Sequence, residues 1–143
     1  MNEIYNSFGF LFAKVSQEMQ MRAAKHLKQF HLTPKQLGLL LVLYENDGIT
    51  QSRAGEIQRV DRTTVMQMTD FLERAGYVCR SPRKSDRRSY SLSLSKEGAD
   101  LTEQLRQDLA EIQQEYLKPL QEDEIQTLKD LLLALVRRGG ADE

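Results

Sequence analysis

Two neighbouring stretches of this 143-residue chain carry side chains that suit binding to a polyanion. In residues 61–76, apolar residues recur at helical spacing on one side, and polar residues occupy the other. Residues 77–93 hold five Lys/Arg and one acid. Hydrogen-bonding side chains on a helix, followed by concentrated positive charge, match base edges and phosphates. The two stretches together predict contact with DNA, although a solvated charged loop is the alternative for the basic stretch taken alone.

The first stretch predicts a helix from Asp61 to Gly76. Asp61 is a good N-cap because its carboxylate can accept amide hydrogens of the first turn. Gly76 suits the left-handed residue that ends many helices. We expect the core side to comprise Val65, Met68, Phe71, Leu72 and Ala75, and the outward side Arg62, Thr63, Met66, Gln67, Asp70 and Arg74.

The second stretch predicts a β-hairpin. Residues 89–94 alternate strictly, with Tyr90, Leu92 and Leu94 on one face, which indicates a half-buried strand. Residues 77–82 form the other strand, and residues 83–88 form a basic connection. A polar-faced helix followed by a basic hairpin is the pattern of a winged helix-turn-helix.

Three helices are expected before this motif. Residues 2–30 keep apolar residues at spacings of three and four, which predicts one long amphipathic helix. Thr33 and Pro34 open a second helix, which is apolar nearly all round and ends at residues 46–48. Thr50 caps a short third helix over residues 51–58. The third and fourth helices with their tight turn form a helix-turn-helix.

Two more helices follow the hairpin. Ser95 caps a fifth helix, which starts at Lys96 and is broken at Pro119. A sixth begins with the acids of residues 122–124 and ends near residues 137–138, before two glycines. The fold class is therefore mainly α with a small β-hairpin wing: a winged helix-turn-helix flanked by N- and C-terminal dimerisation helices.

Composition agrees with a DNA-binding protein only when charge is followed along the chain. The net charge is −1, but residues 50–93 carry nine Lys/Arg and five Asp/Glu, a local charge of +4. The single Cys79 excludes an intramolecular disulfide and suits a reducing cytosol. Since no stretch resembles a membrane span or a signal peptide, we expect a cytoplasmic protein without membrane contact.

The sequence resembles the MarR family of bacterial transcriptional regulators. Four segments carry the resemblance in order and spacing: residues 32–36; residues 49–52 followed by 60–65; residues 72–78; and Asp86-Arg87-Arg88 followed by residues 92–98. Residues 54–55 and 58 depart from the usual pattern, which has Leu-Ala and Leu there. The resemblance implies a homodimeric regulator, with a repressor as the first expectation, that binds a pseudo-palindromic operator as double-stranded DNA.

The resemblance also implies a division into three regions. Residues 1–32 form an N-terminal dimerisation helix, residues 33–95 the DNA-binding domain, and residues 96–143 the C-terminal helices that complete the dimerisation region. Apolar stripes on the terminal helices independently favour a partner chain. The expected dimerisation residues are Ile4, Phe8, Leu11, Phe12, Ile125, Leu128, Leu131, Leu132 and Leu135.

The expected DNA contacts follow partly from side-chain chemistry and partly from the resemblance. Gln67 can pair with adenine, Met66 can contact a thymine methyl, and Arg62 suits guanine or phosphate. By resemblance, Arg88 enters the minor groove, with Asp86 buttressing it or a neighbouring arginine. The expected phosphate contacts are Gln51 and Ser52 at the start of the third helix, Thr63 and Thr64 on the fourth, and Arg80, Arg83, Lys84 and Arg87 on the hairpin.

Members of the family often bind a small phenolic or otherwise amphipathic effector. The candidate lining residues are Phe12, Met19, His26, Leu40 and Tyr44, although ordinary core packing is the simpler interpretation of each. Two alternatives remain. One is a regulator that responds to oxidation of Cys79, which lies beside Arg80; the other is a helical protein-interaction module without DNA binding. No cofactor, metal site or catalytic pattern is expected, so the chain is not expected to be an enzyme.

Overall fold

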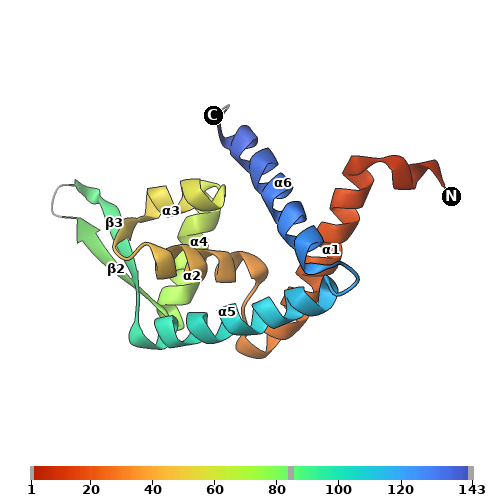
Figure 1. Ribbon diagram of the computed structural model, residues 1–143. Helices are drawn as coiled ribbons and strands as arrows, with labels where there is room; N and C mark the ends of the chain where they lie inside the picture. Colours follow the sequence, from red (N-terminus) through yellow and green to blue (C-terminus); the bar gives the residue numbers. More distant parts are fainter. Residues whose placement is uncertain (1, 84–85, 142–143) are drawn as a thin grey trace. The chain divides into compact units, whose positions relative to one another are not determined.

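The computed structural model describes residues 2–83 and 86–141, except for the side chains of residues 86–88 and 141. The chain divides into two compact units, residues 1–109 and 110–143. The first unit contains the helix-turn-helix, the sheet and most of helix α5 (Figure 1). The second contains the end of α5 and helix α6. No helix within the described residues is long and apolar enough to span a membrane.

The N-terminal region departs from the single helix expected over residues 2–30. A 3₁₀ turn, η1 (Glu3–Asn6), is followed by Ser7 in an extended conformation, then by α1 (Phe8–Leu27) and a second 3₁₀ turn, η2 (Lys28–Phe30). The Ser7 hydroxyl accepts a hydrogen bond from the Phe10 amide at 3.4 Å. Apolar periodicity continues through Ser7, but serine favours this N-cap geometry over a helix interior, so the helix begins after it.

Helix α2 (Pro34–Glu45) forms the centre of the first unit. Thr33 and Gln36 make the reciprocal hydrogen bonds of a capping box, which confirms the predicted start. Leu39, Leu40 and Leu43 are buried. The helix packs against the next two helices and the sheet, so it supplies the surface on which these elements rest.

Helices α3 (Gln51–Gln58) and α4 (Arg62–Arg74) form the expected helix-turn-helix. Thr50 caps α3 and Asp61 caps α4, as predicted. A Cβ atom on Gly55 would lie 2.9 Å from Cγ2 of Val65, so glycine permits the close approach of the two helices. Two core assignments on α4 were wrong, because Phe71 is 41% exposed and Ala75 is also exposed. Thr69 is buried instead, where its hydroxyl donates to the carbonyl oxygen of Val65.

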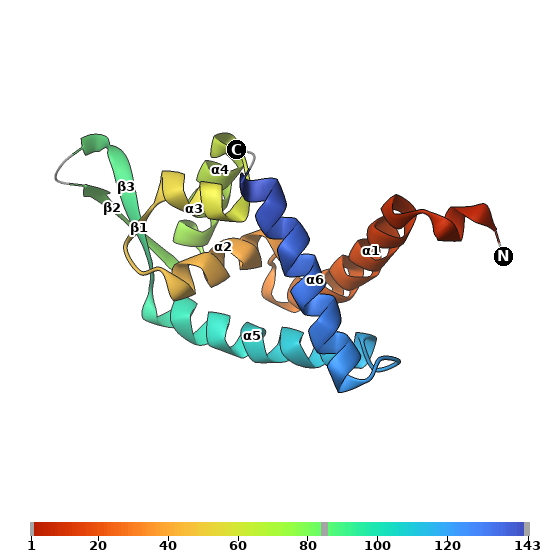
Figure 2. The ribbon, with the colours of Figure 1, turned by 45° about the horizontal axis from the view of Figure 1, so that its top comes forward.

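The wing belongs to a three-stranded antiparallel sheet in the order β1-β3-β2 (Figure 2). Strands β2 (Val78–Arg83) and β3 (Asp86–Leu94) make the predicted hairpin. They extend beyond the strand ends expected at residues 82 and 89, because a register irregularity at Pro82/Arg83 lets pairing continue. Strand β1 (Ile49–Thr50) was not predicted, since two residues are too few for an alternating pattern.

Helices α5 (Lys96–Tyr116) and α6 (Glu122–Ala141) complete the chain. Ser95 accepts a hydrogen bond from the Gly98 amide at 3.0 Å, which confirms the predicted cap. Helix α5 ends three residues before Pro119. Helix α6 continues through Gly139 and Gly140, where we expected it to end; glycine lowers helix propensity but breaks a helix only when its backbone turns left-handed.

Candidate nucleic-acid interface

The N-terminal half of α4 presents the polar side chains that the sequence predicted to face outward. Arg62, Thr63, Met66 and Gln67 are all exposed. The opposite side of the helix is buried through Val65. The first two turns of α4 therefore offer donors, acceptors and one soft apolar side chain on a single accessible face.

The start of α4 is fixed by hydrogen bonds between Asp61 and Thr64. The Thr64 amide donates to one carboxylate oxygen of Asp61, and the Thr64 hydroxyl donates to the other, each at 2.8 Å. These bonds hold the pKa of Asp61 below its ordinary value, with the amide bond as the larger cause. The Thr64 hydroxyl proton is thus used within the cap, and only its lone pairs are free for another group.

Helix α3 presents one free polar side chain at its start. Ser52 is exposed, whereas Gln51 is half-buried and its side-chain oxygen Oε1 accepts a hydrogen bond from the Arg80 guanidinium at 3.3 Å. The two residues predicted together as phosphate contacts therefore differ in their surroundings. Ser52 is accessible, and Gln51 is held against the sheet.

The wing carries the remaining predicted contacts. Arg83 is exposed at the end of β2. Lys84 lies outside the described residues, as do the side chains of Asp86, Arg87 and Arg88. The described part of the wing thus places one predicted cation, Arg83, on the surface.

Arg80 differs from the other predicted contacts because its guanidinium is turned into the protein. Its side chain is 17% exposed and lies 2.9 Å from the Asp70 carboxylate and 3.9 Å from that of Glu73. The guanidinium also lies 5.3 Å from the ring centre of Tyr90. Sequence periodicity could not reveal this cluster, since its members come from α3, α4, β2 and β3.

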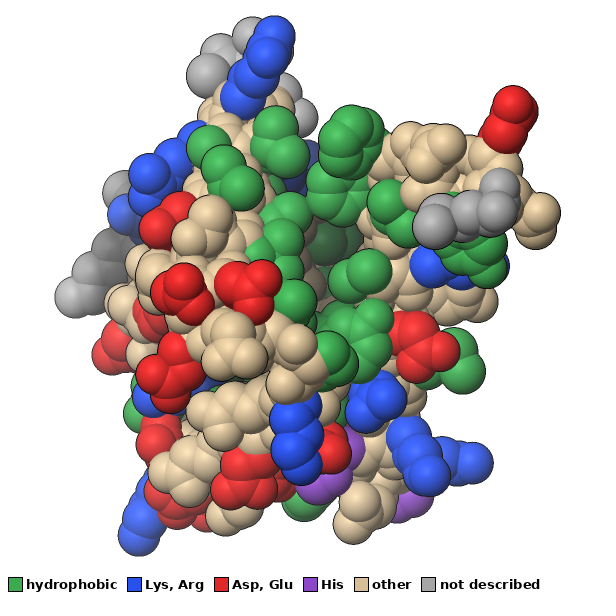
Figure 3. Space-filling model, turned by 45° about the vertical axis from the view of Figure 1, so that its right-hand side comes forward, with side chains coloured by type: hydrophobic (Ala, Val, Ile, Leu, Met, Phe, Trp, Pro, Cys, Tyr) green, Lys and Arg blue, Asp and Glu red, His purple; other side chains and the backbone are tan. Residues whose placement is uncertain are grey.

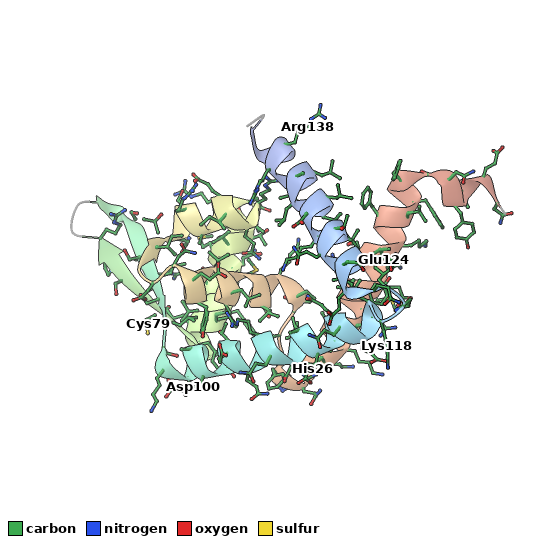
Figure 4. All side chains as sticks on the ribbon, in the orientation of Figure 1. His26, Cys79, Asp100, Lys118, Glu124 and Arg138 are labelled. Atoms are coloured by element: carbon green, nitrogen blue, oxygen red, sulfur yellow. The ribbon has the colours of Figure 1, made fainter. Side chains whose placement is uncertain are left out.

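Cys79 was considered as a thiol switch because Arg80 follows it in the sequence. Cys79 is exposed on β2, where Figure 4 labels it. Its neighbour Val78 is buried, so the two side chains point to opposite faces as predicted. The Arg80 guanidinium is paired with carboxylates of α4, so the geometry gives no support to its activating the thiol.

The residues predicted to line an effector pocket fall into separate settings. Leu40 is a core residue, and Phe12 is exposed and stacks on Phe8 at 6.3 Å between ring centres. Met19 is half-buried. The other two, His26 and Tyr44, are each engaged with an acid of α5.

His26 Nε2 lies 2.8 Å from Oδ2 of Asp108, and Figure 4 shows His26 beside α5. This bond is the main cause of the lowered pKa of Asp108. The Tyr44 hydroxyl donates to Glu103 at 2.5 Å, which raises the pKa of Tyr44 and lowers that of Glu103. The guanidinium of Arg106 covers the Tyr44 ring at 5.2 Å.

The predicted dimerisation residues share one property, which is an accessible apolar side chain. Phe8 is 78% exposed and Leu131 is 60% exposed. Figure 3 shows hydrophobic side chains, in green, gathered at the surface on the face that it draws. Isolated exposed leucines are ordinary, whereas α1 and α6 each carry a run of exposed apolar side chains. The other members are Ile4, Leu11, Phe12, Leu128, Leu132 and Leu135, which are exposed, and Ile125, which is half-buried.

Among the residues that the structure describes, no group of three or more His, Cys, Asp or Glu side chains could hold a metal ion. His26 and the acids described above take part in hydrogen bonds or ion pairs with other side chains of the protein.

Comparison with known proteins gives consistent matches. The MarR family model matches residues 32–90. The organic hydroperoxide resistance transcriptional regulator of Bacillus subtilis is 31% identical over 71% of this chain and 69% of its own length. A putative transcriptional regulatory protein for the hcr operon of Thauera aromatica is 30% identical over 75% of this chain, and this match spans 64% of that relative. A mutant MarR from E. coli complexed with operator DNA is 30% identical, with a TM-score of 0.79, over 89% of this chain and 91% of that one.

Proposed function

The chain belongs to the MarR family and is a DNA-binding transcriptional regulator, and we propose that it acts as a homodimeric repressor on a pseudo-palindromic operator. The accessible polar face at the start of α4 is the observation that supports this most directly. A helix presenting such side chains can enter the major groove while the wing follows the backbone. The protein would act in the cytoplasm, where the bacterial chromosome lies.

The proposed contacts divide into base readout and backbone binding. Gln67 pairs with an adenine, Met66 contacts a thymine methyl, and Arg62 reaches a guanine or a phosphate. On the wing, Arg88 enters the minor groove and is supported by Asp86. The proposed backbone contacts are Ser52, Thr63, Thr64, Arg83, Lys84 and Arg87, which supply affinity and salt dependence without sequence choice.

We further propose that the terminal regions, residues 1–32 and 96–143, form the dimer, and that residues 33–95 bind DNA. The exposed apolar side chains of α1 and α6 support this division, because such surfaces are costly to leave in water. Two copies of α4 then address two half-sites about one turn of DNA apart, roughly 34–36 Å.

An effector of phenolic or amphipathic character is proposed as the signal that releases DNA. Of the candidate lining residues, Phe12 is exposed and Met19 is half-buried. His26 and Tyr44 contact α5, and this helix joins the wing to the C-terminal region. A ligand that changes these contacts would act on α5, the helix that comes immediately after the wing.

A mobility-shift titration tests the proposed function. The probe is the duplex upstream of the protein's own gene, at two salt concentrations and with a non-specific competitor. We expect tight, salt-sensitive binding that survives the competitor. Binding lost to competitor contradicts the operator proposal, and absence of binding at both salt concentrations favours a helical protein-interaction module.

A further inference from the structure

Arg80 joins three of the elements that form the candidate interface. Its guanidinium contacts Asp70 and Glu73 on α4 and Gln51 on α3, while the residue itself lies on β2. The ring of Tyr90 on β3 lies beside it at 5.3 Å. One side chain of the wing root therefore contacts both helices of the helix-turn-helix.

The burial of this guanidinium makes its partners important. The side chain is 17% exposed, and its Nε atom is buried without a hydrogen-bond partner among the described residues. A charge in such a position needs its remaining partners, since removing one of them leaves the charge poorly compensated. Moving Arg80 outward to a phosphate would break its bonds to both helices.

The position of Asp70 on α4 explains what the contact controls. Asp70 lies three residues after Gln67 and four after Met66, so these side chains lie on neighbouring parts of one helix face. A rotation of α4 about its axis would move all three together. Holding Asp70 against the wing root therefore sets the direction in which Gln67 and Met66 point.

We propose that Arg80 is a positioning residue for base readout, which holds α4 in orientation against the wing, and that it does not contact phosphate. This inference rests on the proposed operator binding. A phosphate contact and a positioning residue predict opposite results when Arg80 or its partner is changed. A phosphate contact supplies charge to any DNA sequence, whereas a positioning residue supports only the contacts that depend on the orientation of α4.

Three variants of the 143-residue chain separate these roles. Asp70→Asn removes a negative charge near the interface, so electrostatics alone predicts tighter binding to all DNA. Arg80→Lys keeps the charge but lacks the planar fork that reaches several acceptors at once. Arg74→Gln is the matched control, because Arg74 is an exposed arginine on the same helix outside the cluster and outside the proposed contacts.

The measurement is the dissociation constant for the operator duplex and for a scrambled duplex of the same composition, at four salt concentrations. We expect Asp70→Asn and Arg80→Lys to lower the ratio of operator to scrambled affinity on the order of tenfold, as for loss of one good base contact. Neither variant should bind the scrambled duplex more weakly than the parent, and the salt slope of Arg80→Lys should stay as in the parent. Arg74→Gln should keep the parent ratio.

Three outcomes would overturn the inference. The first is an Asp70→Asn protein that binds the operator as well as the parent or better. The second is an Arg80→Lys protein with parental ratio and salt slope, which is the behaviour of a phosphate contact. The third is equal weakening on both duplexes, which indicates simple loss of folded protein. A parent that shows no operator preference would instead contradict the proposed function itself.

Discussion

The hydroxyl of Ser95 donates a hydrogen bond to the carbonyl oxygen of Gly76 at 2.5 Å, joining the start of α5 to the turn after α4. The same hydroxyl accepts from the Gly98 amide, and the Ser95 amide donates to the carbonyl oxygen of Tyr77 at 3.0 Å. Gly76 has a left-handed backbone with φ of +83°, which lets the chain turn sharply here. These hydrogen bonds attach the start of α5 directly to the turn that follows α4.

This attachment predicts that Gly98→Ala is strongly destabilising. A Cβ atom there would lie 2.0 Å from the carbonyl oxygen of Tyr77, a backbone atom that cannot turn aside. We expect the free energy of unfolding to fall by about 1–3 kcal/mol, the usual cost of overpacking. Chemical denaturation measures it. Gly9→Ala is the control, because its Cβ would make an ordinary contact of 3.7 Å with Ser7; equal behaviour of the two variants would contradict the prediction.

A second prediction concerns the cap of α4. Asp61→Ala removes the acceptor of both Thr64 bonds and should lower the free energy of unfolding. Asp61→Asn keeps an acceptor for the Thr64 amide and should lose less. Thermal or urea unfolding at neutral pH distinguishes the two variants, and a loss from Asn equal to that from Ala would show that the cap bond is unimportant.

The lowered pKa of Asp108 predicts how its bond to His26 depends on pH. Because the folded-state pKa lies below the ordinary 3.8, the ionised carboxylate stabilises the folded state above that value. This contribution is lost as the pH falls below 3.8 and through the folded-state pKa. Asp108→Asn should therefore be less stable than the parent near neutral pH, and the difference should shrink in acid.

Urea unfolding from pH 7 to pH 3 measures that difference. Asp100→Asn is the control, since Asp100 is an exposed acid on the same helix. A stability difference for Asp108→Asn that stays constant over this range would refute the role of its ionised form.

Dimerisation through α6 gives a fourth prediction. Leu131→Gln places an amide where we propose that a second chain covers a leucine that is 60% exposed in the single chain. Loss of its apolar burial should weaken the dimer on the order of tenfold or more. Sedimentation equilibrium measures the dissociation constant, with Lys129→Gln as a control on the same helix. A dimer unchanged by Leu131→Gln would place the interface elsewhere.

A fifth prediction contrasts the wing with α4. Arg83→Gln should weaken binding to every duplex and reduce the dependence of log affinity on log salt by about 1. Gln67→Ala should keep that slope and relax the preference for one base pair on the order of tenfold. Titrations over several salt concentrations, with operator variants at single positions, compare the two. Identical behaviour of both variants would contradict the division between backbone and base contacts.

The local features of this fold followed well from the sequence. Caps at Thr33, Thr50, Asp61 and Ser95 are short-range hydrogen bonds, so residue type and position were enough to predict them. The break at Ser7 was missed because apolar spacing continues across it. The spacing of apolar residues indicates a helical surface. It does not reveal one side-chain hydrogen bond, such as that from the Phe10 amide to Ser7, that starts a helix at a later residue.

Features that depend on residues far apart in sequence were harder to predict. Phe71 keeps the spacing of a core residue, yet it is exposed, since the burial of a helix face depends on what packs there. Arg80 looked like one more cation of a basic hairpin. Its pairing with Asp70 depends on how β2 passes α4, which no pattern within either element records.

The pairing of β1 with β3 has a consequence for the dynamics of the first unit. Ile49 is opposite Leu92, so two residues before α3 are tied to the last strand of the wing. The chain between them holds α3, α4 and β2, and this pairing closes it into a loop. The units that open cooperatively in native-state hydrogen exchange often coincide with supersecondary motifs such as this one. The amides of α4 and of the wing root should therefore exchange as one cooperative unit.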